Sequence, residues 1–256
     1  MRVPRDIGDV LTDLDGVLDR LEVGDPRRAF AATYRRSTLA VSEQVQARGF
    51  VDPPWVERWD VAFADLYLAP VTADLDGRPV PGPWGVAYAY ARTDPDQPLL
   101  RHLLLGMNAH INYDLPQALL SVITDDEFDD PVVRARRGED HRLMDDLLTS
   151  RVSAEDAELD AAGSVRSRVD RVLQPANREA TRRFLRESRR KVWANARALS
   201  AARRKGPEAY DAALARLEQL SAAKVSELVR PGQVLLRLAV RGFGVVLPEA
   251  TLVKVD

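Results

Sequence analysis

Residues 99 to 120 read Leu-Leu-Arg-His-Leu-Leu-Leu-Gly-Met-Asn-Ala-His-Ile-Asn-Tyr-Asp-Leu-Pro-Gln-Ala-Leu-Leu, a helical pattern with polar residues between apolar flanks. Four polar side chains fall within seven positions of it: Asn108, His110, Asn112 and Asp114. Polar groups in a core segment are costly unless they are paired or used. The stretch therefore predicts a buried central helix that carries a functional site.

His110 and Asp114 are four residues apart, so they share one face of a helix. Gly106 lies on the same face and costs about 1 kcal/mol relative to alanine inside a helix. The missing side chain leaves room for a ligand or another helix to approach His110. Pro116 cannot donate to the carbonyl of Asn112, which predicts a kink or a restart of the helix near residues 112–114.

A purely structural interpretation of the same stretch stays open. Asp114 could cap a short helix that begins at Leu115, with Pro116 in its first turn. His110 would then be a hydrogen-bonded core histidine, and Asn108 and Asn112 would satisfy neighbouring backbone groups.

Helical periodicity continues through most of the chain and predicts an all-α fold, a single compact multi-helix bundle over residues 1–256. Prolines and glycines predict a long loop at 70–83. Residues 232–241 favour a helix, and a hairpin or an extended tail over 232–256 is the alternative. The expected helices are 6–23, 27–48, 53–68 with Asp52 as its cap, 84–91, 98–120, 131–151, 164–205 with an interruption near 174–175, and 208–229.

The amino-acid composition excludes some classes of partner and cofactor. The chain has 256 residues with 45% apolar and 30% charged residues, a net charge of -2 and no cysteine. The balanced charge argues against nucleic acid as a partner. The missing cysteines exclude disulfides and thiolate metal sites. Without an apolar leader or a membrane-spanning run, we expect a cytoplasmic protein with a small-molecule substrate.

A second His-x-x-x-Asp pair occurs at His141 and Asp145. A histidine and a carboxylate one helical turn apart can converge on one ion. Two such pairs, with His110 and Asp114 as the other, would supply a site for a divalent metal such as Zn, Fe or Mn. The alternative is that the charged surroundings of His141 are a solvated helix start.

Other side chains are candidates for the same interior. Asp60 lies beside aromatic residues and could be a desolvated acid with a raised pKa, suited to proton transfer. We therefore group Asp60 with His110, Asn112 and Asp114 as candidate catalytic residues. The candidate substrate-binding residues are Asn108, Tyr67, Tyr34 and Trp84, together with Arg189 and Trp193, a possible anion clamp in a basic stretch.

Residues 103–116 resemble the signature of a bacterial family defined only as a domain of unknown function, Asn-Ala-His-Ile-Asn-x-Asp-Leu. Residues 50–55, 60–67, 83–84 and 189–196 are similar to that family too. The resemblance implies a compact helical domain and no particular activity, and the pair at His141 is not part of its pattern. A more distant similarity, to helical zinc phospholipase C and nuclease enzymes, is an analogy only, because those enzymes use more than the three histidines present here.

These observations predict an enzyme with a buried pocket in a helical bundle. His110 would be a general acid–base group or a metal ligand, with Asp114 fixing its tautomer or sharing the ion. Metal-dependent hydrolysis of an ester or phosphoester is the first hypothesis. The alternatives are a metal-free acid–base cyclase or isomerase acting on an apolar metabolite, or a non-catalytic helical module that binds a ligand or a partner.

Overall fold

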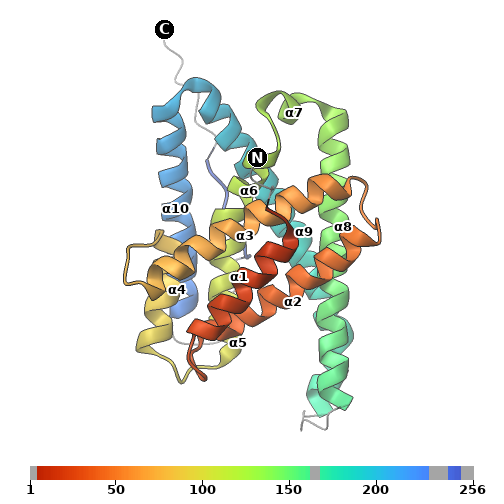
Figure 1. Ribbon diagram of the computed structural model, residues 1–256, viewed down its shortest axis with the longest axis vertical. Coiled ribbons are helices and arrows are strands. Elements are labelled where there is room, and N and C mark those ends of the chain that lie inside the picture. The colour runs from red at the N-terminus through yellow and green to blue at the C-terminus, as the bar shows by residue number, and fades with distance from the viewer. Residues whose placement is uncertain (1–4, 162–167, 231–241, 249–256) are drawn as a thin grey trace.

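The computed structural model describes residues 5–161, 168–230 and 242–248, with side chains described over 5–150, 187–230 and 242–248. Within these ranges the fold is all-α (Figure 1), as predicted, and no strand occurs. A short π-helical turn, η1 (His110–Asp114), interrupts the central helix. The helices are α1 (Ile7–Arg20), α2 (Arg27–Gln46), α3 (Pro53–Leu75), α4 (Gly82–Thr93), α5 (Leu99–Ala109), α6 (Leu115–Val122), α7 (Asp125–Asp129), α8 (Pro131–Ala161), α9 (Arg168–Lys205) and α10 (Pro207–Val229).

Side-chain caps begin several of these helices, and the one at Asp52 is where the sequence predicts it. The carboxylate of Asp52 accepts a hydrogen bond from the Trp55 N–H at 3.3 Å, and Pro53 occupies the first turn of α3. Asp6 caps α1 in the same way, by accepting from the Asp9 N–H at 3.0 Å. Gly206, at a φ of 123°, makes the sharp turn between α9 and α10 that a residue with a side chain would resist.

Two expected interruptions are absent. The predicted loop at 70–83 is wrong over its first half, because α3 continues through Pro70 to Leu75 and the connection to α4 spans only residues 76–81. Pro70 is buried within the helix, and Val71 and Ala73 beyond it are buried too, so tertiary packing outweighs the local cost of proline. Likewise, α9 runs unbroken through the predicted interruption at 174–175. The expected helix at 232–241 lies outside the described residues.

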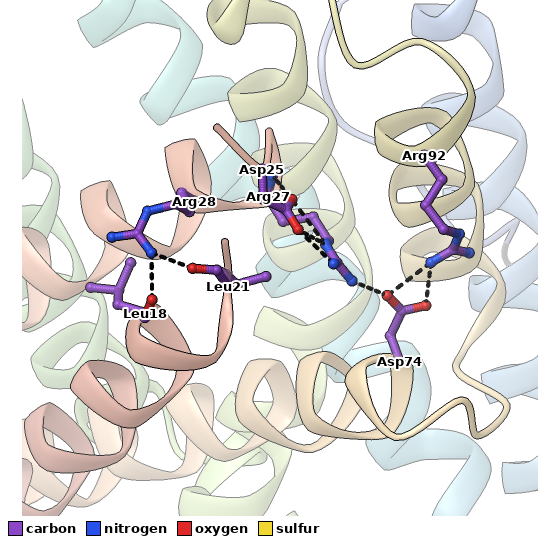
Figure 2. Close-up of polar contacts among 7 residues, drawn as sticks. All are labelled: Leu18, Leu21, Asp25, Arg27, Arg28, Asp74 and Arg92. Carbon is purple, nitrogen blue, oxygen red and sulfur yellow. Dashed lines mark hydrogen bonds and ion pairs between the residues drawn. The ribbon is translucent and has the colours of Figure 1, made fainter. Parts of the chain in front are cut away.

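A cluster of charged side chains ties the α1–α2 turn to the ends of α3 and α4 (Figure 2). Asp74 accepts hydrogen bonds from Arg27 at 2.6 Å and from Arg92 at 2.8 Å. The guanidinium group of Arg27 also donates a hydrogen bond to Oδ2 of Asp25, at 2.6 Å. Arg28 donates to the backbone carbonyl oxygens of residues 18 and 21, which are left unpaired at the end of α1. The extension of α3 to Leu75 is what brings Asp74 into this cluster.

The core has two apolar clusters that meet at the central helix. The first includes Leu14, Tyr67 and Trp84, and the second includes Trp55, Leu119 and Leu199. Phe63 packs against both. In Figure 1, α8 and α10 stand upright on opposite sides of the molecule, and α1, α2 and α3 cross between them. The stretch α5–η1–α6 contributes to both clusters, so its polar residues lie at their junction. In the described part of the chain, no helix is both long and apolar enough to cross a membrane.

Candidate functional site

The site is built on the π-helical turn η1. The Leu115 N–H bonds to the carbonyl of His110, five residues back, instead of to the usual fourth residue. Pro116 explains the change, because it has no N–H with which to continue the α-helical ladder. The kink predicted at residues 112–114 is therefore this wider turn, which holds one extra residue in a helix and is a frequent feature of functional sites.

His110 and Asp114 lie side by side at the two ends of this turn. His110 Nδ1 lies 2.8 Å from Asp114 Oδ2, and the same oxygen accepts a hydrogen bond from Trp84 Nε1 at 2.9 Å. Both side chains of the pair are buried. The indole N–H is a donor only, so Trp84 orients the carboxylate, and the carboxylate orients the imidazole.

Aromatic side chains enclose the imidazole. The ring of Phe63 stacks on that of His110 at a centroid distance of 3.6 Å, and the ring of Tyr34 meets it edge-on at 4.7 Å. Phe30 approaches from α2, at 5.7 Å. A Cβ on Gly106 would lie 2.7 Å from Cγ of Phe30. The space beside Gly106 is thus taken by a side chain of another helix, one of the two occupants that the sequence allowed.

Some buried polar atoms at the pair have no hydrogen-bond partner among the described residues. Nε2 of His110 and the hydroxyl of Tyr34 belong to the site itself, and the hydroxyl of Tyr88 is on the ring that stacks on Trp84. Oδ2 of Asp60, one turn before Phe63 on α3, is unpaired as well. An unpaired buried polar group costs roughly 1–3 kcal/mol. A fold that keeps several of them near one histidine is consistent with an interior that receives polar groups from outside the chain.

Burial shifts the titration of these groups toward their neutral forms. It lowers the pKa of His110 well below its ordinary value and raises the pKa of Asp114 well above its own, against the hydrogen bond from Trp84. Burial also raises the pKa of Asp60 to about 7, with a contribution from the charge of Glu57. Burial raises the pKa of Tyr34, and the charges of Asp60 and Asp114 add to that rise.

Asn108 and Asn112 do not join the pair. Asn108 donates to the carbonyl of Leu104 at 3.0 Å and accepts from Asn112 at 3.1 Å. Asn112 also donates to the backbone carbonyl of Phe243, at 3.2 Å. Both amides are therefore used within the chain, as the structural interpretation of the motif proposed for them.

The second His-x-x-x-Asp pair forms a separate cluster against α9. Trp193 Nε1 donates to His141 Nδ1 at 3.1 Å, and Arg189 pairs with Asp145 at 2.8 Å. Burial lowers the pKa of His141 to about 3 and raises that of Asp145 to about 7. Arg189 and Trp193 are thus engaged here, and the structure does not bring them to His110 as the predicted anion clamp requires.

The predicted four-ligand metal site is not assembled. Within the described ranges, no three histidine or acidic side chains lie close enough together to hold a metal ion. The physical reason is the packing of the two pairs. His110 and Asp114 contact aromatic side chains of α2, α3 and α4, whereas His141 and Asp145 pair with side chains of α9.

Comparison with protein families places residues 7–231 in a family of unknown function, DUF5995. The chain belongs to this family. Comparisons with curated proteins and with solved structures gave no match. The DUF5995 match includes η1 and the whole aromatic surround of His110, and it ends before the described C-terminal segment 242–248.

Sequence reasoning placed Tyr34, Tyr67 and Trp84 beside His110, and the structure brings them there: the ring of Trp84 lies 5.9 Å from the imidazole and that of Tyr67 6.0 Å. It missed Phe30 and Phe63. Phe63 shares a helical face with Asp60 and Tyr67, which is a signal for its position. For Phe30, the only signal in the sequence is Gly106, whose missing side chain indicates that a large side chain packs against the central helix there.

Proposed function

We propose that this chain is an enzyme that uses the His110–Asp114 pair for metal-free general acid–base chemistry on a small, largely apolar molecule. One observation carries the proposal. Nδ1 of His110 is held by Asp114, which is held by Trp84, while Nε2 is buried and has no partner. An oriented histidine with one free nitrogen is the arrangement that proton transfer requires.

The hydrogen bonds around Asp114 favour one tautomer of the neutral His110. Asp114 Oδ2 accepts from the indole N–H of Trp84, and the tautomer that lets it accept from His110 as well carries the proton on Nδ1. The lone pair then lies on Nε2. When Nε2 takes a proton from a substrate, the imidazolium that forms keeps its Nδ1–H hydrogen bond to Asp114, which offsets part of the cost that burial imposes on the charged ring.

The surroundings favour an apolar substrate that carries few polar groups. Phe63, Tyr34 and Phe30 present aromatic surface to the imidazole. The hydroxyl of Tyr34 and the carboxyl of Asp60 offer unpaired polar atoms. Asp60, with a pKa of about 7, exchanges a proton readily near neutral pH and can return one to the product. Because His110 is buried, a substrate reaches it only when the helices around it part.

Two competing functions make different predictions. Metal-dependent hydrolysis needs a ligand set beyond His110 and Asp114, and the described residues do not supply one. A non-catalytic helical module is favoured by one specific contact, the stacking of Phe63 on His110 at 3.6 Å, which fills the space above the imidazole. In that case His110 serves chiefly to specify the packing of the core.

The test is hydrogen–deuterium exchange at carbon, which detects proton abstraction without knowledge of the product. The protein is incubated in D₂O with a panel of small ketones, enones and terpenoid alcohols. The deuterium content of each compound is then measured by mass spectrometry. We expect deuterium uptake or isomerisation of at least one compound, reduced by about a hundredfold or more in His110→Gln. His102→Gln is the matched control, because His102 is a buried histidine on α5 that packs on Tyr90 and lies outside the pair.

Three results would argue against the proposal. Equal turnover by His110→Gln and the wild type would exclude His110 as the acid–base group. Turnover that EDTA abolishes would point to metal chemistry instead. If no compound is bound or converted, and His110→Gln loses thermal stability, the non-catalytic function is the better one.

A further inference from the structure

The C-terminal segment 242–247 lies between η1 and α9, outside regular secondary structure and with no strand beside it in the described part of the molecule. Its burial varies along the chain, and residues 244 and 245 are both half-buried. Phe243 and Leu247 are buried, whereas Val246 between them is 48% exposed. Phe243 is one of the largest fully buried side chains, and Leu247 packs into the second core cluster.

Two asparagine amides take the place of a neighbouring strand. Asn112 donates to the carbonyl of Phe243 at 3.2 Å and accepts from the Val245 N–H at 3.3 Å. Asn195, on α9, donates to the carbonyl of Val245 at 3.0 Å and accepts from the Leu247 N–H at 2.8 Å. Every second residue of the segment, at 243, 245 and 247, therefore makes backbone hydrogen bonds to an asparagine side chain. Peptides bound by strand addition are held through alternate backbone groups in the same way.

The segment approaches side chains of α9 closely at its two glycines. A Cβ at residue 244 would lie 2.4 Å from Cδ of Lys191, whose ammonium group donates to the carbonyl of Gly244 at 3.2 Å. Gly242 has a φ of 69°, and a Cβ there would lie 2.7 Å from Oε1 of Glu187. The surface thus selects a Gly-x-Gly backbone with an aromatic anchor between the glycines.

We propose that the groove between η1 and α9 is a peptide-binding site for an extended Gly-Phe-Gly-Val-Val-Leu segment, filled here by the chain's own residues 242–247 as an exchangeable ligand. Asn112 and Asn195 lie inside the region that matches the family, and the segment lies outside it. The segment is held by side-chain amides, one lysine and two apolar anchors, which is how a separate peptide is held. This inference does not depend on the proposed enzymatic activity.

The test uses the full chain and a labelled peptide that spans residues 241–248, with binding followed by fluorescence anisotropy. In the wild type the tethered segment competes at a high effective concentration, so the peptide should bind weakly. The double substitution Phe243→Ala, Leu247→Ala removes both anchors of the tethered segment, and binding should become about tenfold tighter or more. Adding Asn195→Ala to that variant should abolish binding, and a peptide with alanine at position 244 should not bind.

Val246→Ala is the matched control, because this exposed side chain faces away from the groove and should leave peptide binding as in the wild type. Failure of the folded double variant to bind the peptide, or binding that survives Asn195→Ala, would overturn the proposal. A dimer that dissociates on Asn195→Ala would place the segment in the groove of a second copy and overturn occupancy within one chain.

If the double variant does not fold, hydrogen exchange of the wild-type protein tests whether the segment detaches. The amides of Val245 and Leu247 should open at a lower free energy than the core of α5, because an exchangeable segment detaches without global unfolding. Exchange of these amides only by global unfolding would show that the segment is an integral part of the fold.

Discussion

At the scale of single residues, Gly106 shows how one absent side chain shapes the site. Phe30 fills the place that a Cβ would take, and from there its ring meets both the imidazole of His110 and the indole of Trp84. A glycine inside a helix is unfavourable by itself, so tertiary packing explains its presence here.

Gly106→Ala should therefore destabilise the protein although alanine is the better helix former. Overpacking of a core typically costs about 1–3 kcal/mol, which exceeds the gain of about 1 kcal/mol in helix propensity. Gly16→Ala is the control, because Gly16 is an exposed residue of α1 with no atom near the added Cβ, and its substitution should raise the melting temperature. Equal effects of the two substitutions in thermal melts would contradict this explanation of Gly106.

His141 predicts a pH dependence of stability. Its pKa falls from 6.5 to about 3 on folding, because burial disfavours the charged form, and Nδ1 must stay unprotonated to accept from Trp193. Below pH 6.5 the unfolded state binds a proton that the folded state does not, so the free energy of unfolding decreases as the pH falls toward 3. The contribution of one such proton approaches about 1.4 kcal/mol per pH unit.

The substitution His141→Gln isolates this contribution, since a glutamine carbonyl can still accept from Trp193. As the pH is lowered from 7 to 4, the wild type should lose stability relative to the variant. The measurement is the unfolding free energy of both proteins by urea titration. Asp145 acts in the opposite direction, because its raised pKa favours folding at low pH, so the difference between the two proteins is the relevant quantity. If the difference in unfolding free energy does not change with pH, His141 takes up a proton as readily in the folded protein as in the unfolded chain.

At the scale of helices, the charged cluster around Asp74 determines how the first helices are joined. The side chain of Asp74 is only 8% exposed and receives Arg27 from α2 and Arg92 from α4. Substitution of this buried carboxylate leaves Arg27 with Asp25 as its remaining partner and leaves Arg92, whose side chain is 54% exposed, to solvent. The loss is therefore more costly than that of an exposed ion pair but less costly than leaving a fully buried charge unpaired.

Asp74→Asn should lower the unfolding free energy by about 1–2 kcal/mol. Asp76→Asn is the matched control in the next turn of the chain. Asp76 pairs with Arg20 and Arg78 at the surface, so its substitution should leave the melting temperature nearly unchanged. If both variants melt alike, the cluster in Figure 2 is not a principal link between α2, α3 and α4.

At the scale of the whole molecule, the central helix joins the two core clusters. Leu105 and Ala109 belong to the first cluster, Tyr113 and Leu119 belong to the second, and Phe63 of α3 packs against both. Side chains that belong to both clusters couple the packing of one cluster to that of the other, so loss of one should destabilise the other.

We therefore expect one cooperative unfolding transition. Far-ultraviolet circular dichroism and tryptophan fluorescence should give coincident curves, and the calorimetric and van't Hoff enthalpies should agree. Fluorescence is informative because Trp84 reports on the first cluster, whereas Trp55 and Trp59 report on the second. Two separated transitions would show that the clusters are independent units.

What the sequence determined by itself is local. The capping carboxylate of Asp52, the break between helices at Gly206 and the pairing of His110 with Asp114 one turn later all follow from spacing and residue type. These features depend on neighbours within a few residues along the chain, which is why they can be predicted without knowledge of the packing.

Only the tertiary structure decided what lies across from each of these residues. It directed Arg189 and Trp193 to His141 instead of His110, filled the space at Gly106 with Phe30, and assigned Asn112 to a segment more than a hundred residues away. It also carried α3 through Pro70, against local preference. Each outcome depends on which helix faces lie against each other, and helical periodicity identifies a buried face without identifying its partner.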